Sequence, residues 1–123
     1  MAGYVEGASR EQATLFPERL DELIEPEAQV RVVDLFVNGI DLRELGFTKA
    51  VPASEGRPPY NPADLLKLYI YGYLHQVRSS RRLERECRRN IELLWLLNRL
   101  APDFKTIADF RRDNREGIGK VCR

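Results

Sequence analysis

The sequence predicts an all-α protein, a multi-helix bundle with a helix-turn-helix-like unit in its C-terminal half. Three observations support this fold class. Apolar residues repeat at helical spacing, helix start and stop signals recur between the repeats, and no segment alternates polar and apolar residues as a strand does. With 123 residues, 43% hydrophobic and 32% charged, the chain has the size and balance of one globular domain with a single core.

Three regions are expected within this one domain. Residues 1–47 form an acidic helical region, residues 48–60 a loop rich in Pro and Gly, and residues 61–123 a basic helical region. Residues 1–74 carry 7 Lys or Arg against 12 Asp or Glu, a net charge of −5, whereas residues 75–123 carry 13 against 7, a net charge of +6. These charges sum to the +1 of the whole chain. Contact with a polyanion is therefore expected from the second half.

The acidic region is predicted to contain two helices and a turn. A short helix is expected at about 18–24. A second helix begins at Pro26, because the missing N–H of proline costs nothing at the first helical position. Asp41 then caps a short turn at 42–45, which Gly46 ends in the left-handed conformation.

The next helix has the strongest start signal in the chain. Asn61 is a favoured N-cap, Pro62 takes the first helical position, and Asp64 places a negative charge in the first turn, where the helix dipole favours it. From Leu65 to Val77 apolar and aromatic side chains surround this helix nearly all round. We therefore expect it to be the central, buried helix of the bundle.

Two helical stretches follow the central helix. Arg78-Ser79-Ser80 is interpreted as a short turn whose last serine caps a helix that begins at Arg81. This helix either continues to Arg99 or breaks near Asn90. The segment Thr106-Ile107-Ala108-Asp109 matches a capping box and predicts the start of the last helix.

Arginines gather on one flank of the helix predicted after Ser80. At about 100° per residue they fall within an arc of roughly 120°, opposite an aliphatic stripe. Guanidinium groups bind phosphate oxygens and guanine edges, so the pattern predicts DNA binding. The alternative is a solvated face on which Glu84, Glu86 and Glu92 pair with the arginines. With neighbours on either side, the predicted DNA-binding residues are Arg78, Arg81, Arg82, Arg85, Arg88, Arg89, Arg112 and Arg115.

The remaining residues predict no catalytic or metal site. Cys87 and Cys122 lie far apart, and His75 is the only other soft ligand, so neither a zinc site nor a disulfide is expected. Trp95 is assigned to the core or to a dimer interface. No cofactor is expected in this chain. Because no apolar run could cross a bilayer and the N-terminus does not resemble a leader, a cytoplasmic protein is expected.

Several segments carry a resemblance to a known family. They are Tyr60-Asn61-Pro62, LLKLYIYGY at 65–73, RSSRRLERE at 78–86, Arg89-Asn90, WLL at 95–97, PDF at 102–104 and TIADFR at 106–111. Together they resemble the N-terminal domain of bacterial insertion-sequence transposases of the InsH-like, DDE class. The resemblance implies recognition of terminal inverted repeats in DNA transposition. It also implies that the catalytic carboxylates and their divalent metals belong to a following RNase-H-like domain, so this chain alone is not expected to be an enzyme.

Three functions remain open at this point. The first is a non-catalytic, DNA-binding N-terminal portion of a transposase. The second is a protein-interaction module, a truncated product that inhibits the full-length transposase through apolar helix faces near Trp95. The third is a stand-alone helix-turn-helix regulator that binds a palindromic site as a dimer, with Arg81, Arg82 and Arg85 in the major groove. The expected partners are DNA and another copy of the chain or the full-length transposase, with no membrane.

Overall fold

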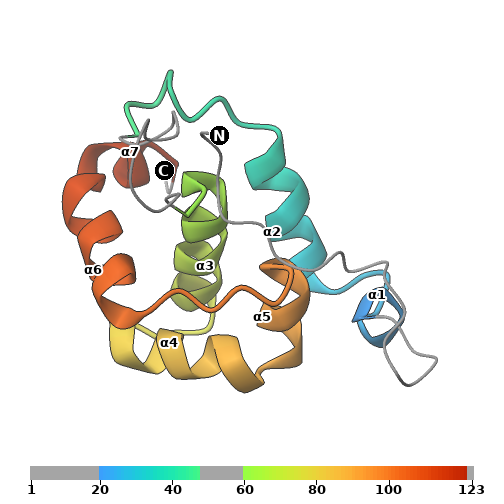
Figure 1. The fold of residues 1–123 in the computed structure, drawn as a ribbon. Helices are drawn as coiled ribbons and strands as arrows, with labels where there is room; N and C mark the ends of the chain where they lie inside the picture. The colour runs from blue at the N-terminus through green and yellow to red at the C-terminus, as the bar shows by residue number, and fades with distance from the viewer. Residues whose placement is uncertain (1–19, 48–59, 122–123) are drawn as a thin grey trace, which may run out of the picture.

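A computed structural model describes residues 20–47 and 60–121 of the chain. Within these residues it contains seven helices and no strand, which confirms the predicted all-α class. The central helix α3 is flanked by α2 and α6, and α4 runs across its C-terminal end (Figure 1). The helices are α1 (Leu20–Leu23), α2 (Gln29–Asn38), α3 (Pro62–Leu74), α4 (Ser80–Arg89), α5 (Ile91–Leu96), α6 (Phe104–Asp113) and α7 (Arg115–Val121). Most of the loop predicted at 48–60 lies outside the described residues.

The start of α3 is formed by the signals that predicted it. The Asn61 side chain accepts a hydrogen bond from the Ala63 N–H at 2.9 Å, Pro62 is the first helical residue, and Asp64 lies in the first turn. Leu66 and Leu68 are fully buried. α3 is therefore the central helix of the bundle, as its apolar surface predicts.

The end of α3 comes earlier than predicted, at Leu74 rather than Val77. Gln76 adopts a left-handed backbone with φ of 59°, and the Val77 N–H donates to the Gly72 carbonyl at 2.8 Å. This is a Schellman ending, with glutamine at the position that glycine usually occupies. Because no Gly or Asn marks that position, the apolar pattern extended the predicted helix too far.

The caps of α4 and α6 also differ from the prediction. Ser79, rather than Ser80, caps α4, and its Oγ accepts from the Arg82 N–H at 3.3 Å. Asp103 caps α6 in place of Thr106, whose N–H donates to the Asp103 carboxylate at 3.0 Å. Both helices consequently begin before the predicted residue, and the capping-box interpretation of 106–109 is wrong.

In the acidic region the turn is confirmed and one helix start is not. The Asp41 carboxylate accepts from the Arg43 N–H at 3.0 Å, and Gly46 takes a positive φ of 84°, as the turn prediction requires. α2 begins at Gln29 and not at Pro26, because residues 26 and 27 form a turn ahead of it.

Asn90 breaks the helical stretch that follows α3, which confirms one of the two predicted alternatives. Its side-chain oxygen accepts from the N–H groups of Glu92 and Leu93 and so caps α5. Its side-chain amide donates to the Tyr71 hydroxyl at 3.1 Å. These bonds hold the break against the central helix.

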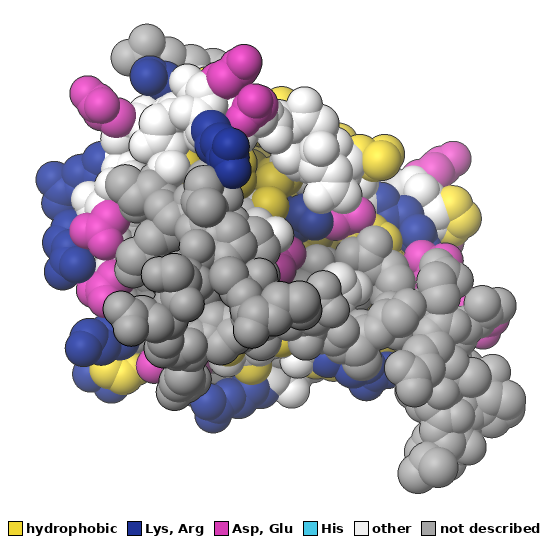
Figure 2. Space-filling view, turned by 45° about the horizontal axis from the view of Figure 1, so that its top comes forward, with side chains coloured by type: hydrophobic (Ala, Val, Ile, Leu, Met, Phe, Trp, Pro, Cys, Tyr) yellow, Lys and Arg dark blue, Asp and Glu magenta, His cyan; other side chains and the backbone are white. Residues whose placement is uncertain are grey.

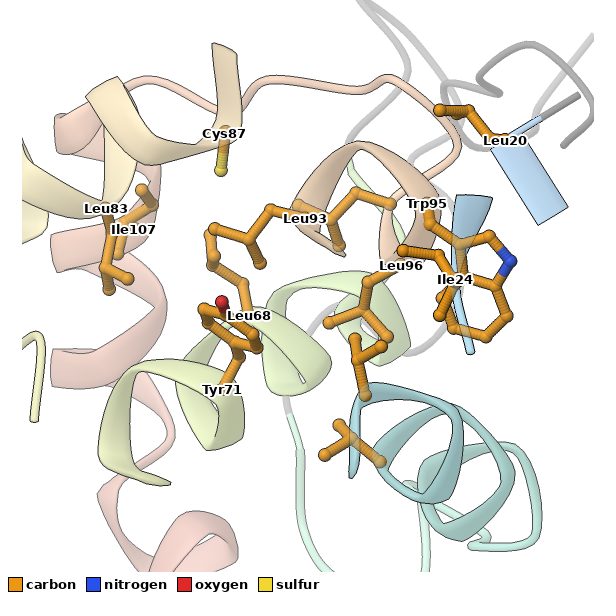
Figure 3. Packing of buried hydrophobic residues seen from close by; sticks show 13 residues of the cluster. Leu20, Ile24, Leu68, Tyr71, Leu83, Cys87, Leu93, Trp95, Leu96 and Ile107 are labelled. Atoms are coloured by element: carbon orange, nitrogen blue, oxygen red, sulfur yellow. The ribbon is translucent and has the colours of Figure 1, made fainter. Parts of the chain in front are cut away.

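Two clusters of buried apolar side chains hold the helices together. In the larger cluster, side chains from all of the helices α1 to α6 meet (Figure 3). The smaller cluster joins α3 to α2, α6, α7 and the turn after α2 through Val37, Phe47, Leu65, Leu66, Phe110 and Ile118. Burying one such aliphatic or aromatic side chain contributes about 1.5–3 kcal/mol. Because these buried side chains fix the rotation of each helix, they also decide which of its side chains face solvent.

A buried ion pair fastens α2 to α3. Lys67 Nζ lies 2.7 Å from Asp34 Oδ1, and both side chains are less than a tenth exposed. A buried charge is stable only with a partner at this range. The pair joins residues far apart in sequence, and the sequence alone did not predict it.

The helix-turn-helix unit stays a prediction. α3 and α4 are linked by residues 75–79, a longer connection than the predicted turn at 78–80. α4 packs chiefly against α5 and α6, and it meets α3 where Leu83 lies against Gly72. A Cβ added at Gly72 would lie 2.7 Å from the Val77 carbonyl oxygen and 3.1 Å from the Leu83 side chain, so the backbone contact requires glycine here and the Leu83 contact is tight.

Candidate nucleic-acid interface

α4 has one buried flank and one cationic flank. Leu83 and Cys87 are at most 1% exposed, and their side chains enter the larger core cluster (Figure 3). The five arginines of the helix are all exposed on the other flank. They are Arg81, Arg82, Arg85, Arg88 and Arg89. Within α4 the helical wheel therefore placed both flanks correctly, because the core fixes the rotation of the helix. The predicted aliphatic stripe does not continue past the break at Asn90, since Ile91 begins α5 and is 41% exposed.

Pairing with glutamate distinguishes the two ends of the cationic flank. Near the C-terminal end, Arg89 contacts Glu86 at 2.6 Å and Arg88 contacts Glu84 at 3.8 Å. Hydrogen bonds from Arg89 and Asn90 hold the pKa of Glu86 below its ordinary value, so Glu86 is a carboxylate at neutral pH. The alternative of a solvated, paired face therefore applies to this end of α4.

The N-terminal part of the flank carries charge that no carboxylate pairs with directly, although the nearby Arg82 charge contributes to the lowered pKa of Glu86. Within the described ranges, the guanidinium groups of Arg82 and Arg85 form no ion pair or hydrogen bond. The Arg81 guanidinium lies over the Phe104 ring, 4.1 Å from its centroid. A cation–π contact positions the guanidinium without neutralising it. Three positive charges thus remain at the N-terminal part of α4.

The other predicted arginines belong to neighbouring elements. Arg78 lies in the link before α4, and Arg115 is the first residue of α7; both are exposed. Arg112, in the last turn of α6, contacts Asp109 at 3.4 Å and Asp113 at 3.0 Å. The predicted set therefore comprises five residues of α4 and three that lie outside it.

Arg111 is a positioning residue that the prediction left out. Its Nη1 donates to the Arg78 carbonyl at 2.6 Å and to Ser80 Oγ at 3.3 Å. Its guanidinium also lies 5.5 Å from the centroid of the Tyr69 ring. These contacts tie α6 to the start of α4. The prediction did not include Arg111, because helical spacing describes contacts within one helix. It does not reveal a hydrogen bond to a residue 33 positions earlier in the sequence.

Charge on the surface is mixed. In Figure 2 the Lys and Arg side chains lie mainly toward the left and lower edges, with Asp and Glu among them. The net charge of +1 therefore does not describe any one face. Binding of a polyanion would depend on local clusters such as the N-terminal part of α4.

The side chains of Cys87 and His75, which could in principle react or bind a metal, take part in packing. Burial raises the pKa of the Cys87 thiol to about 12, which keeps it protonated and unreactive. The His75 ring lies against Tyr71, with ring centroids 4.2 Å apart. Across residues 20–47 and 60–121, no three His, Cys, Asp or Glu side chains gather in a way that could hold a metal ion. Over the same residues, no helix has both the length and the apolar character needed to span a bilayer.

Trp95 belongs to the core and not to a surface. It is 3% exposed, and its Nε1 donates to the Asp21 carboxylate at 3.0 Å. Of the two positions expected for Trp95, the core or a dimer interface, the structure shows the core. Within the described residues, α2 exposes three neighbouring apolar side chains, and Val32, Leu35 and Phe36 are 62%, 74% and 50% exposed.

Comparison with known proteins identifies the family. The family model described as "Transposase domain (DUF772)" matches residues 18–113, a span that contains α1 to α6. No curated protein and no solved structure matches the chain.

Proposed function

Because the chain belongs to the transposase domain family DUF772, we propose that it is the DNA-binding N-terminal portion of an insertion-sequence transposase of the InsH-like, DDE class. In this role it recognises the terminal inverted repeats during DNA transposition. Strand cleavage and transfer, with their divalent metals, are assigned to a separate RNase-H-like domain. The chain itself is a binding module and not an enzyme.

The cationic flank of α4 is the observation that carries this proposal. Arg81, Arg82 and Arg85 are exposed and make no ion pair with a carboxylate in the described part of the chain. Guanidinium groups bind phosphate oxygens in bidentate fashion, and each phosphate neutralised releases counterions. A surface of this kind favours DNA over an uncharged partner.

The position of these arginines also suits the major groove. They lie in the first two turns of α4, and residues near the start of a recognition helix are the ones that reach base edges. The opposite flank of α4 is anchored by Leu83 and Cys87, so the helix is presented rigidly. A helix with side chains is about 10–12 Å across, close to the roughly 12 Å width of the major groove.

The test is duplex binding at several salt concentrations. Binding of a fluorescent duplex that carries one terminal inverted repeat is measured by anisotropy. We expect Arg82→Ala with Arg85→Ala to weaken binding by about tenfold or more and to lower the salt slope by about 2, since about 1 is lost for each phosphate contact. Unchanged affinity and slope would remove this flank from the interface.

The matched control uses arginines of the same helix that already have partners. Arg88→Ala with Arg89→Ala removes the same formal charge, but these side chains pair with Glu84 and Glu86. We expect a smaller loss of duplex affinity than for Arg82 and Arg85. Equal losses from both double variants would indicate that only total charge matters, and not the exposed N-terminal part of α4.

A second function, protein interaction, is favoured by one observation on α2. Val32, Leu35 and Phe36 are spaced as neighbours on one helix face, and each is at least half exposed. A contiguous exposed apolar surface is typical of a protein contact. In this role the chain associates with another copy of itself or with the full-length transposase.

A further inference from the structure

A groove lies between the start of α4, the C-terminal half of α3, and helices α6 and α7. It consists of two adjoining hollows of about 580 and 400 Å³, sizes typical of ligand sites. Tyr69 and Arg111 line both hollows, so the two adjoin where the Arg111 guanidinium lies against the Tyr69 ring. We call this the Tyr–Arg groove, and its principal lining residues are Tyr69, Tyr73, Arg78, Arg111, Arg112 and Arg115.

The lining of the Tyr–Arg groove is cationic. Four arginines line it, and none of its described lining residues is acidic. Arg112 is partly offset by Asp109 and Asp113. Arg78 and Arg115 are exposed, and their guanidinium groups form no ion pair within residues 20–47 and 60–121. A ligand that fits this lining carries negative charge along its length.

The groove also offers an exposed aromatic ring. α3 places Tyr69 and Tyr73 one turn apart on the same face. One side of Tyr69 is occupied by the Arg111 guanidinium, whereas Tyr73 is 64% exposed. A large exposed ring next to arginines is the combination that stacks an unpaired base and holds the adjoining phosphates.

We propose that the Tyr–Arg groove binds a single-stranded segment of nucleic acid. One base stacks on the Tyr73 ring, and the neighbouring phosphates contact Arg78 and Arg115. A base inside a duplex has both faces covered by its neighbours, so it cannot stack on Tyr73 without leaving the helix. The groove therefore selects unpaired nucleotides. This role is separate from duplex recognition by α4 and does not depend on it.

The test uses an oligothymidylate of about ten nucleotides, within the site sizes usual for single-strand binding. Its binding to the full chain is measured by fluorescence anisotropy. We expect Tyr73→Ala to weaken binding by about fivefold or more, because the stacked base is lost. Tyr73→Phe keeps the ring and should bind as the unmodified chain does. Arg115→Ala should weaken binding and flatten its salt dependence.

The α4 variants separate this site from the duplex interface. We expect Arg82→Ala with Arg85→Ala to leave oligothymidylate binding unchanged, and Tyr73→Ala to leave duplex binding unchanged. Circular dichroism checks that each variant is folded; Tyr73 is exposed, so its removal should preserve α3. The oligothymidylate results alone would support the groove even if duplex binding itself proved absent.

Three results would overturn the proposal. The first is no binding of oligothymidylate by the unmodified chain. The second is equal binding by the unmodified chain and Tyr73→Ala. The third is equally effective competition by polyglutamate of matched charge, because an acidic peptide uses the arginines without needing a base-stacking ring.

Discussion

α2 and α4 are ten-residue helices that bury one flank in the same core, yet they present opposite surfaces. α2 buries Val30, Val33 and Val37 and leaves a row of aliphatic and aromatic side chains exposed. α4 buries Leu83 and Cys87 and leaves five arginines exposed. The buried flanks serve the fold alike, so the exposed flanks distinguish the functions: an apolar surface suits a protein, and a cationic one suits a polyanion.

The largest expected effect is the loss of stability on breaking the buried Lys67–Asp34 ion pair, which joins α2 to α3. Lys67→Met should lower the free energy of unfolding by about 3–5 kcal/mol, because Asp34 loses the ammonium group 2.7 Å away in a buried position. Urea unfolding measures this loss. The double variant Asp34→Leu with Lys67→Met should recover most of it, since neither charge remains. A loss below about 1 kcal/mol for the single variant would mean that the pair does not anchor α2.

The next effect separates the two exposed flanks directly. Leu35→Glu should reduce any concentration-dependent association seen by sedimentation velocity and should leave duplex affinity unchanged. Arg82→Glu with Arg85→Glu should leave association unchanged and weaken duplex binding by about thirtyfold or more, roughly 2 kcal/mol. If Leu35→Glu instead weakens duplex binding as much as the arginine variant does, the assignment of association to α2 and of duplex binding to α4 is wrong.

The smallest effect concerns the buried flank of α4 at alkaline pH. The pKa of Cys87 is raised to about 12 in the folded protein, whereas an unfolded thiol ionises near pH 9. This contribution to stability is complete below about pH 9 and is lost as the pH rises toward 12, because only the unfolded thiol releases its proton. At about pH 9.5 the loss should be under about 1 kcal/mol.

Urea unfolding of the unmodified chain and of Cys87→Ala, compared across that pH range, measures the effect. Tyr71→Phe is the control for a second buried group, because burial also raises the pKa of the Tyr71 hydroxyl to about 12 and its ionisation falls in the same pH range. A second measurement is the reaction of Cys87 with a thiol reagent at about pH 8. Rapid reaction in the folded protein would contradict the buried position of this flank.

The sequence could predict the features that depend on neighbouring residues. The start of α3 at Asn61-Pro62, the break at Asn90 and the rotation of α4 rest on caps and helical spacing, which act over a few residues. The glycine ending at Gly46 is of the same kind. For this reason the predicted rotation of α4 is confirmed, although its predicted first residue is wrong.

The features that were missed depend on contacts between distant segments or on unusual backbone choices. Lys67–Asp34 and Arg111–Arg78 each join residues 33 positions apart. The end of α3 relies on Gln76 in a left-handed conformation that favours glycine. The exposure of Tyr73 on a helix expected to be buried was also missed, since periodicity does not reveal which side of an all-round apolar helix stays uncovered.

Under the proposed function, the break at Asn90 sets how much DNA α4 of a single copy can read. By ending α4 after ten residues, it limits the rod to about 15 Å. That length spans only about four base pairs at 3.4 Å each. In that proposed role, sequence information beyond those pairs would come from other elements of this chain or from a second copy, because the Asn90 cap ends α4 there.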